Sequence, residues 1–361
     1  DVYKRQIPDY IKEAAVEAIN DNYHKYSPVD GYLDLKKSIC KKFKRDNNLD
    51  YDVDQIVVST GAKQSIANVC MSLINKGDEV LIPTPYWVSY SAMVALAEGV
   101  PVFINPEEDS NYKITAQQLE SAITDKTKML MLNSPNNPSG SVFTEQEYLE
   151  FSKVLLKYPN IIIISDEIYE HINYGVKSVS FASIPGMFDR TVTVNGISKA
   201  YAMTGWRIGY LGAPKVIAKA CNKMQGQITS GANCIAQRAT IKALEESPEK
   251  IQYMVDEFKI RRDFIIDLVT KINGFNIKQP PMGAFYIFPD ISELFGKTFK
   301  GVTINDANDL SMLILEKAHV ATVPGDAFGY PNCIRISYSA SREQIEEAIK
   351  RIKDLLSLIH I

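Results

Sequence analysis

Lys199 is the residue of this chain whose type and surroundings most clearly suggest chemistry. The segment before it, Thr191 to Val194, alternates β-branched residues as a buried strand does. Most lysines are solvated surface groups, so Lys199 alone would indicate nothing. The residues around it, however, suit a turn that holds an anion, and they are Gly196, Ser198, Gly205, Arg207 and Gly209. We therefore predict an amine at a strand end, beside an anion site.

Two further polar residues follow buried strands in the same way. Lys128 to Leu132 predicts a strand that leads toward Asn137, and Ile161 to Ile164 predicts a central parallel strand that ends near Asp166. Strands that alternate with helices imply an open α/β sheet, which binds ligands beyond the carboxyl ends of its strands. We therefore expect an amide, a carboxylate and an amine at one edge of one sheet.

Two earlier segments suggest parts of a binding site. Ile56 to Thr60 predicts a strand, followed by a turn at Gly61-Ala62-Lys63 and a helix from Gln64 to Leu73. This arrangement aims backbone N–H groups and the positive end of a helix dipole at one point, where a phosphate would bind, although many βα units share it. Trp87 follows a proline-containing loop, and a ring in that position packs in a core or stacks on a flat ligand.

Together these motifs resemble those of class I/II pyridoxal-phosphate-dependent aminotransferases, and most closely the prokaryotic-type aspartate aminotransferases. The resemblance extends from Ile11 to Lys353. The matching segments are Gly196 with Ser198-Lys199 and Arg207-Ile208-Gly209 (the cofactor-lysine signature), Asn133 to Gly140 (Asn-Pro-Thr-Gly, here with Ser139 for threonine) and Tyr26 to Gly31 (Tyr-x-Pro-x-x-Gly).

The resemblance implies a role for each candidate residue. Lys199 would carry pyridoxal 5'-phosphate (PLP) as a Schiff base and act as the proton-transfer base, and Asp166 would hold the proton of the pyridine nitrogen. Arg335 would bind the substrate carboxylate with its bidentate guanidinium. The other expected cofactor contacts are Gly61, Ala62, Lys63, Ser198, Arg207 and Tyr26 of the partner subunit for the phosphate, Asn137 and Tyr169 for the phenolic oxygen, and Trp87 for the ring. Trp87 and Asn137 are also expected to contact substrate, with Arg335.

The same resemblance implies the fold and the domains. We expect the fold of type I PLP-dependent transferases, with a large domain built on a mostly parallel central sheet flanked by helices, and a small α+β domain. The expected divisions are 7–25 as an N-terminal part of the small domain, 26–265 as the large PLP-binding domain and 266–355 as the C-terminal small domain. Two such chains would form a homodimer with shared active sites.

The ends of the chain are expected to be non-native. Residues 1–6 and 356–361 can be encoded by the two strands of one short DNA, which resembles a sequencing-library adapter. We therefore expect the natural protein to extend upstream, where a targeting signal could lie. A substrate-contacting glycine of the family would fall at or before residue 6.

Composition excludes several classes of function. The 361 residues are 45% hydrophobic, which suits a large core and about two domains. A net charge of −3 without a basic block argues against nucleic acid, and no apolar run approaches the roughly 20 residues of a membrane span. Five cysteines without C-x-x-C spacing indicate a reducing, cytoplasmic setting, and with only four scattered histidines we expect no metal site.

Within this family the reaction itself stays open at the sequence level. Aspartate and 2-oxoglutarate are the best candidates for donor and acceptor, but they rest on family likeness alone, and aromatic or alanine donors remain. Other PLP enzymes of the same fold, such as C–S lyases and decarboxylases, use the same cofactor chemistry. A further alternative is a PLP-binding regulatory domain of a truncated transcription factor.

Overall fold

The computed structural model describes residues 6–108, 110–299 and 301–357. Its main element is a seven-stranded sheet with the order β1-β7-β6-β5-β4-β2-β3. The strands are β1 (Ile56–Ser59), β2 (Glu79–Pro83), β3 (Val100–Ile104), β4 (Thr127–Asn133), β5 (Ile162–Asp166), β6 (Thr191–Gly196) and β7 (Gly209–Gly212). Only β7 runs antiparallel to its neighbours β6 and β1 within this sheet. The predicted α/β class with a mostly parallel sheet is therefore confirmed.

The central strands are buried because helices cover both faces of the sheet. Every residue of β6 is buried, and four of the five residues of β5 are buried. The predicted strands at Lys128–Leu132, Ile161–Ile164 and Thr191–Val194 are thus confirmed as parts of β4, β5 and β6, although β5 begins at Ile162, one residue later than predicted. The sequence prediction did not contain β7, a short strand with glycine at both ends.

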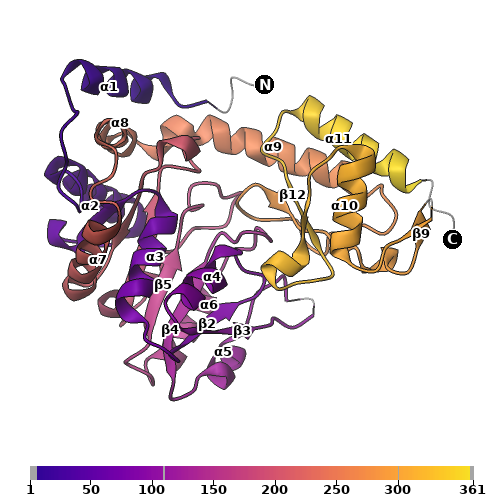
Figure 1. Ribbon diagram of the computed structural model, residues 1–361, viewed down its shortest axis with the longest axis horizontal. Coiled ribbons are helices and arrows are strands. Elements are labelled where there is room, and N and C mark those ends of the chain that lie inside the picture. Colours follow the sequence, from indigo (N-terminus) through magenta and orange to yellow (C-terminus); the bar gives the residue numbers. More distant parts are fainter. Residues whose placement is uncertain (1–5, 109, 300, 358–361) are drawn as a thin grey trace.

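The helices around this sheet form three groups (Figure 1). Helices α3 (Ala62–Leu73), α4 (Ser89–Leu96) and α7 (Lys215–Ile228) pack on one face. Helices α5 (Ala116–Ala122) and α6 (Glu145–Leu155) pack on the other. A third cluster joins α1 (Asp9–Asn20), α2 (Leu33–Asn47) and α8 (Cys234–Glu245) to β1 and β7. Helices α5 and α6 both begin with a capping box, at Thr115 and Thr144.

The C-terminal third forms a second core. Helix α9 (Gln252–Val269) leads from α8 toward a three-stranded antiparallel sheet of β8 (Tyr286–Ile287), β11 (Val323–Pro324) and β12 (Ile334–Ser337). Helices α10 (Ala307–Ala318) and α11 (Arg342–Leu356) and the hairpin of β9 (Thr298–Phe299) and β10 (Val302–Thr303) complete it. This core also contains side chains from the turn after β5, among them Tyr169 and Ile172, so it contacts the end of that strand.

The N-terminal helix α1 packs against α2 and α8. Ile11 and Ala15 of α1 belong to the cluster formed with α2 and α8, not to the C-terminal core. The apolar face of α1 is covered mainly by α8. Of the expected non-native ends, residues 1–5 and 358–361 lie outside the described residues, whereas Leu356 is buried at the end of α11.

Gly209 shows how closely the sheet approaches the helix that starts beside it. A Cβ atom at Gly209 would lie 2.1 Å from the backbone nitrogen of Ala62 and 2.4 Å from the carbonyl carbon of Gly61. Backbone atoms cannot move aside as a flexible side chain can. The N-terminus of α3 is therefore held against the sheet by the absence of a side chain at this position.

We predict that Gly209→Ala lowers the free energy of unfolding by about 2 kcal/mol, because overpacking against backbone forces α3 away from the sheet. Gly226→Ala is the matched control, since its Cβ would lie 3.7 Å from Val29, at ordinary contact distance. In the helix interior this control is expected to stabilise by about 0.5 kcal/mol. Urea unfolding of both variants measures the difference, and equal effects would contradict the prediction.

Candidate active site

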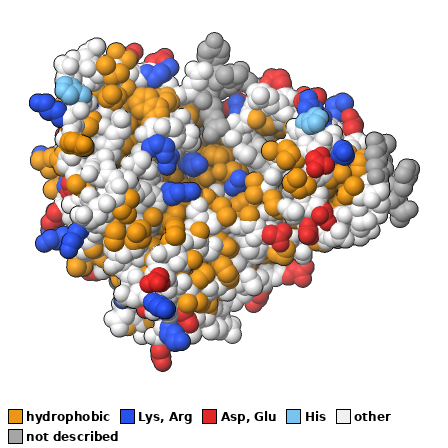
Figure 2. All heavy atoms as spheres, in the orientation of Figure 1, with side chains coloured by type: hydrophobic (Ala, Val, Ile, Leu, Met, Phe, Trp, Pro, Cys, Tyr) orange, Lys and Arg blue, Asp and Glu red, His pale blue; other side chains and the backbone are white. Residues whose placement is uncertain are grey.

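A cavity of about 330 Å³ lies at the carboxyl edge of the large sheet. Its lining is Ala62, Lys63, Trp87, Asn133, Asn137, Asp166, Ile168, Tyr169, Ser198, Lys199, Thr204, Arg207, Tyr286 and Arg335. In the space-filling view, basic side chains gather near the middle of the face shown, beside hydrophobic ones (Figure 2). The structure thus brings together ten of the predicted site residues, drawn from six segments of the chain.

Asp166 ends β5 and lies fully within this site. Its Oδ2 accepts a hydrogen bond of 2.6 Å from the Tyr90 hydroxyl, and its Oδ1 accepts one of 3.3 Å from the Ile168 amide. Burial raises the pKa of this carboxyl to about 6, although both hydrogen bonds and the nearby Lys199 oppose the rise. Burial likewise raises the pKa of Tyr90, so Tyr90 remains a donor and Asp166 an acceptor. A buried carboxylate held in this way can bind a protonated nitrogen.

Lys199 extends from the turn after β6 and is partly buried. Its Nζ lies 5.6 Å from the ring centroid of Tyr169 and 5.7 Å from that of Phe285. These two rings belong to the C-terminal core, whereas Lys199 follows a strand of the large sheet. The amine therefore lies between the two cores, within the same cavity as Asp166.

Two hydroxyl groups meet at the Tyr169 side of the cavity. The hydroxyl oxygens of Tyr169 and Tyr286 lie 3.0 Å apart. Burial, the neighbouring Tyr286 and the charge of Asp166 raise the pKa of Tyr169 well above its usual value. Tyr169 consequently keeps its proton at neutral pH and can donate a hydrogen bond to an oxygen in the cavity.

Arg335, on β12, faces Asn137 across the cavity. Its Nη1 donates a hydrogen bond of 2.8 Å to Asn137 Oδ1. The guanidinium carbon lies 4.5 Å from the ring centroid of Tyr286 and 4.9 Å from that of Phe328. Arg335 Nε is buried and has no hydrogen-bond partner among the described residues. Since an unpaired buried donor is costly, this guanidinium is suited to a ligand carboxylate.

The opposite side of the cavity has the features of an anion site. Gly61 adopts a φ of 87° and precedes α3, so Ala62 and Lys63, expected in the turn, form the first turn of the helix. A Cβ at Gly61 would lie 2.2 Å from Arg207 Nη2, which shows that a side chain there would displace this guanidinium. Backbone N–H groups, the helix dipole and Arg207 thus converge, as a phosphate requires. Ser198 lines the same cavity.

Trp87 and Lys63 lie side by side at the cavity wall. Lys63 Nζ is 4.9 Å from the ring centroid of Trp87, and the indole is perpendicular to the Tyr90 ring at 5.4 Å. The indole is therefore held on two sides, and its position leaves it available to a flat ligand.

Two predicted site residues do not line this cavity. Gly61 lies just outside it as the residue before α3. Tyr26 is 99% exposed and borders a separate surface hollow formed with residues 231–235. Its expected role in a partner's site requires such exposure, but no second chain is described.

Several cavity residues were absent from the sequence prediction. They are Asn133, Ile168, Thr204 and Tyr286, and Tyr90, which bonds to Asp166 from outside the cavity lining, was absent too. Asn133 orients Asn137 by accepting a 2.9 Å hydrogen bond from its amide, and it opens the Asn-Pro motif that the sequence did reveal. Tyr90 lies three residues after Trp87, at a helical spacing that could have marked it as a neighbour.

Comparisons with known proteins show what the whole chain is similar to. The family model for aminotransferase class I and II matches residues 2–352. A protein of Rickettsia bellii named probable aspartate/prephenate aminotransferase is 47% identical over 349 residues, which are 96% of this chain and 87% of that protein. The aspartate aminotransferase of Rhizobium meliloti superposes with a TM-score of 0.95 at 42% identity, covering 98% of this chain and 89% of that one. The aromatic aminotransferase of Pyrococcus horikoshii gives a TM-score of 0.90 at 37% identity, covering 98% and 93%.

The raised pKa of Asp166 makes a prediction for stability. In the folded protein the Asp166 carboxyl stays protonated up to about pH 6, whereas the ordinary pKa of an aspartate is 3.8. The free energy of unfolding therefore falls as the pH rises between these two values. Because one pKa unit corresponds to about 1.4 kcal/mol, the ionised carboxyl costs on the order of 3 kcal/mol above pH 6.

We therefore predict that Asp166→Asn raises the melting temperature of the cofactor-free protein at pH 7.5, and that the gain shrinks toward pH 4. Thermal unfolding of both proteins across this pH range measures the effect. A gain that is independent of pH would show that burial of the charge is not its cause.

Proposed function

The chain belongs to the class I and II aminotransferase family, and on this premise we propose that it moves the amino group of an L-amino acid to a 2-oxo acid, with aspartate and 2-oxoglutarate as the first candidates. The observation that carries this proposal is the convergence of Lys199, Asp166 and Arg335 on one cavity. An amine, a carboxylate and a guanidinium there can respectively engage a carbonyl carbon, a ring nitrogen and a carboxylate.

We propose PLP as the cofactor because the residues present fit its groups. Gly61, the first turn of α3 and Arg207 form a cradle for a phosphate, and Asp166 provides a buried carboxylate for a protonated ring nitrogen. When bound, PLP supplies an electron sink that acidifies the Cα–H bond of an attached amino acid. Tyr169 and Asn137 would hold its phenolic oxygen, and Trp87 would lie against its ring.

The side chains then have separate tasks. Lys199 Nζ would hold the cofactor, and its free amine would take the proton from the substrate Cα atom. Asp166 keeps the ring nitrogen protonated, and Tyr169 donates to an oxygen from its side of the cavity. Arg335 orients the substrate through its α-carboxylate, which its unpaired Nε and its Nη groups can bind in bidentate fashion.

The surroundings of this site are also part of the proposal. We propose a homodimer in which the fully exposed Tyr26 of the partner subunit reaches the phosphate, and a large domain at 26–265 with a small domain at 266–355. All five cysteines are unpaired, which suits a reducing compartment such as the cytoplasm. In the part of the chain that the structure describes, no helix has the length and apolarity needed to cross a membrane.

The relatives' names favour aspartate over other donors. Both the Rickettsia bellii and the Rhizobium meliloti proteins have names that contain aspartate, although the Pyrococcus horikoshii protein is named for aromatic substrates. The first of these names also includes prephenate, which makes prephenate the second 2-oxo acid to test as an acceptor.

We predict that the PLP-loaded protein converts its cofactor to pyridoxamine phosphate when L-aspartate is added without any 2-oxo acid. The visible absorption band of the lysine-bound cofactor would disappear and the band of pyridoxamine phosphate would replace it. Lys199→Ala should abolish this change, whereas the exposed-helix control Lys153→Ala should leave it intact. A Lys199→Ala protein that still transaminates at the normal rate would refute the assignment.

A second prediction concerns Arg335→Lys, which keeps the charge but removes the planar bidentate donor. We expect KM for the amino acid to rise about tenfold or more, with PLP affinity unchanged, because a buried charge-assisted hydrogen bond contributes about 1.5–3 kcal/mol. Steady-state kinetics and cofactor titration measure the two quantities. A variant that loses PLP and leaves KM unchanged would place Arg335 in the cofactor site instead.

A further inference from the structure

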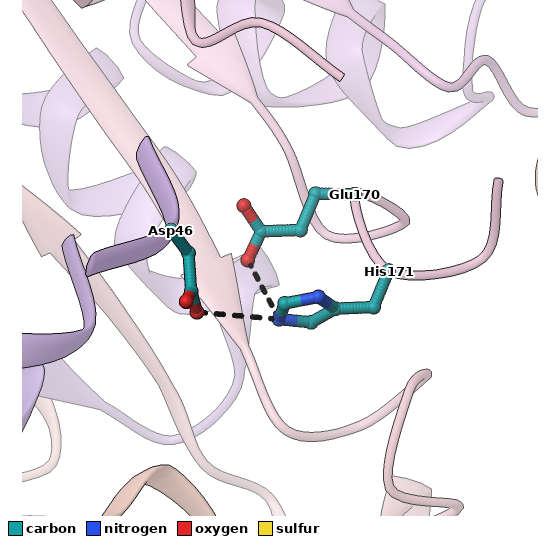
Figure 3. A group of neighbouring side chains, drawn as sticks. All are labelled: Asp46, Glu170 and His171. Carbon is teal, nitrogen blue, oxygen red and sulfur yellow. Dashed lines mark ion pairs between the residues drawn. The ribbon is translucent and has the colours of Figure 1, made fainter. Parts of the chain in front are cut away.

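A buried cluster of charged side chains lies beneath the turn that follows β5. It joins Lys42 and Asp46 of α2 to Glu170 and His171 of the turn, and His171 Nε2 lies 3.2 Å from Glu170 Oε1 and 3.7 Å from Asp46 Oδ2 (Figure 3). Lys42 is 1% exposed and pairs directly with Glu170. Arg45 pairs with Asp46 at 2.6 Å. The cluster therefore contains its own cations, which argues against a metal ion between these carboxylates.

Asn47, the last residue of α2, connects the two carboxylates of the turn. Its Nδ2 donates hydrogen bonds to Glu170 Oε2 at 2.6 Å and to Glu167 Oε2 at 3.2 Å. Its Oδ1 accepts a hydrogen bond of 2.6 Å from Lys42 Nζ. One helix end thus binds both carboxylates that flank Tyr169. We call Lys42, Asn47 and Glu170 the α2 anchor.

The α2 anchor also contacts the strand that leads to Lys199. Asn195 Nδ2 donates a hydrogen bond of 2.7 Å to Glu170 Oε1, and Asn195 Oδ1 accepts one of 2.7 Å from the Gly196 amide. Glu170 therefore lies between the turn that contains Asp166 and Tyr169 and the end of β6. Four residues beyond Asn195 lies Lys199 itself.

The ion pair between Lys42 and Glu170 stabilises the contact between α2 and the turn after β5. Burial alone would raise the pKa of Glu170, but the Lys42 and His171 charges and the hydrogen bonds from Lys42 and Asn47 lower it to about 2. Glu170 is therefore ionised at every physiological pH. A buried pair of this kind resists disruption, because removing one partner leaves an uncompensated charge away from water.

We propose that Lys42 and Asn47 are positioning residues of the active site, which act through Glu170 to fix Asp166 and Tyr169 relative to Lys199. This inference rests on the proposed function in assigning roles to those three residues. Lys42 and Asn47 themselves do not line the cavity. The alternative is that the α2 anchor contributes to global stability only.

Arg190 provides a matched control at the other end of β5. It is 8% exposed, and its guanidinium donates to the carbonyl oxygens of Ile161 at 3.0 Å and Leu155 at 2.8 Å. Arg190→Met and Lys42→Met therefore each remove one buried cation, bound to residues just before β5 in the first case and just after β5 in the second. Only the second change lies beside the active-site turn.

The first measurement is backbone amide hydrogen exchange in the cofactor-free proteins. We expect Lys42→Met to accelerate exchange in residues 166–172, where the amides of Ile168 and Glu170 bond to Asp166 and Glu167. Arg190→Met should accelerate exchange around residues 155–163 instead. Unchanged exchange at 166–172 in Lys42→Met would overturn the proposal, whether or not the protein binds PLP.

The second measurement is PLP affinity by titration of the visible absorption band. We expect Lys42→Met to bind PLP about tenfold more weakly and to have a kcat about tenfold lower, because small displacements of reacting groups are costly. Arg190→Met should retain both values at a comparable loss of melting temperature. Equal losses of affinity in the two variants would show that the α2 anchor acts through stability alone.

Asn47→Ala keeps the test decisive if Lys42→Met does not fold. It removes the hydrogen bonds to Glu167 and Glu170 but leaves the ion pair between Lys42 and Glu170 intact. We expect the same faster exchange in residues 166–172, with a smaller loss of PLP affinity.

The proposed function and the positioning role can be refuted independently of each other. A wild-type protein that binds no PLP contradicts the proposed function, whereas a wild-type protein that binds PLP beside unaffected variants contradicts only the positioning role.

Discussion

Parallel pairing of β4, β5 and β6 aligns the ends of three strands, and the whole site depends on that alignment. Asn133 pairs with Asp166, and Asp166 pairs with Val194, so one row of residues crosses the sheet at its carboxyl edge. The loops that continue from this row contain Asn137, Tyr169 and Lys199. A shift of one residue in either pairing would turn Asp166 to the other face of the sheet, since side chains alternate along a strand.

The alternation also separates two neighbouring carboxyl groups. Asp166 bonds to Tyr90 on the side of α4, whereas Glu167 accepts hydrogen bonds from Ser165, Ser180 and Asn47. Burial raises the pKa of both, to about 6 for Asp166 and about 7 for Glu167. The Asp166 carboxyl faces the cavity, whereas the Glu167 carboxyl faces Asn47, Ser165 and Ser180. Two consecutive residues thus divide between the cavity and the hydrogen-bonded structure behind it.

The sequence predicted the strands that lead to Asn137, Asp166 and Lys199 from local patterns, and the resemblance to a known family supplied most of the other residues of the cavity lining. Buried strands followed by Asn137, Asp166 and Lys199 are visible in composition and spacing alone. The antiparallel β7 was not predicted, since four residues with two glycines give little periodic signal. Tyr90, Tyr286 and the α2 anchor were also missed, because each acts through a contact with a residue far away in the chain. The sequence around a single tyrosine or lysine does not indicate which distant residue it will contact.

The ion pair between Lys42 and Glu170 has a consequence for how the protein folds. These residues are 128 positions apart, so their contact closes a long loop and forms late on entropic grounds. A growing chain that has not yet released β5 from the ribosome lacks Glu170, so Lys42 has only the partners that α2 itself provides, Asn47 and Asp46. Only when the turn after β5 and the end of β6 have both emerged can the cluster become buried. Burial of the cluster beneath the cavity is thus coupled to the docking of α2, a helix made long before β5 and β6.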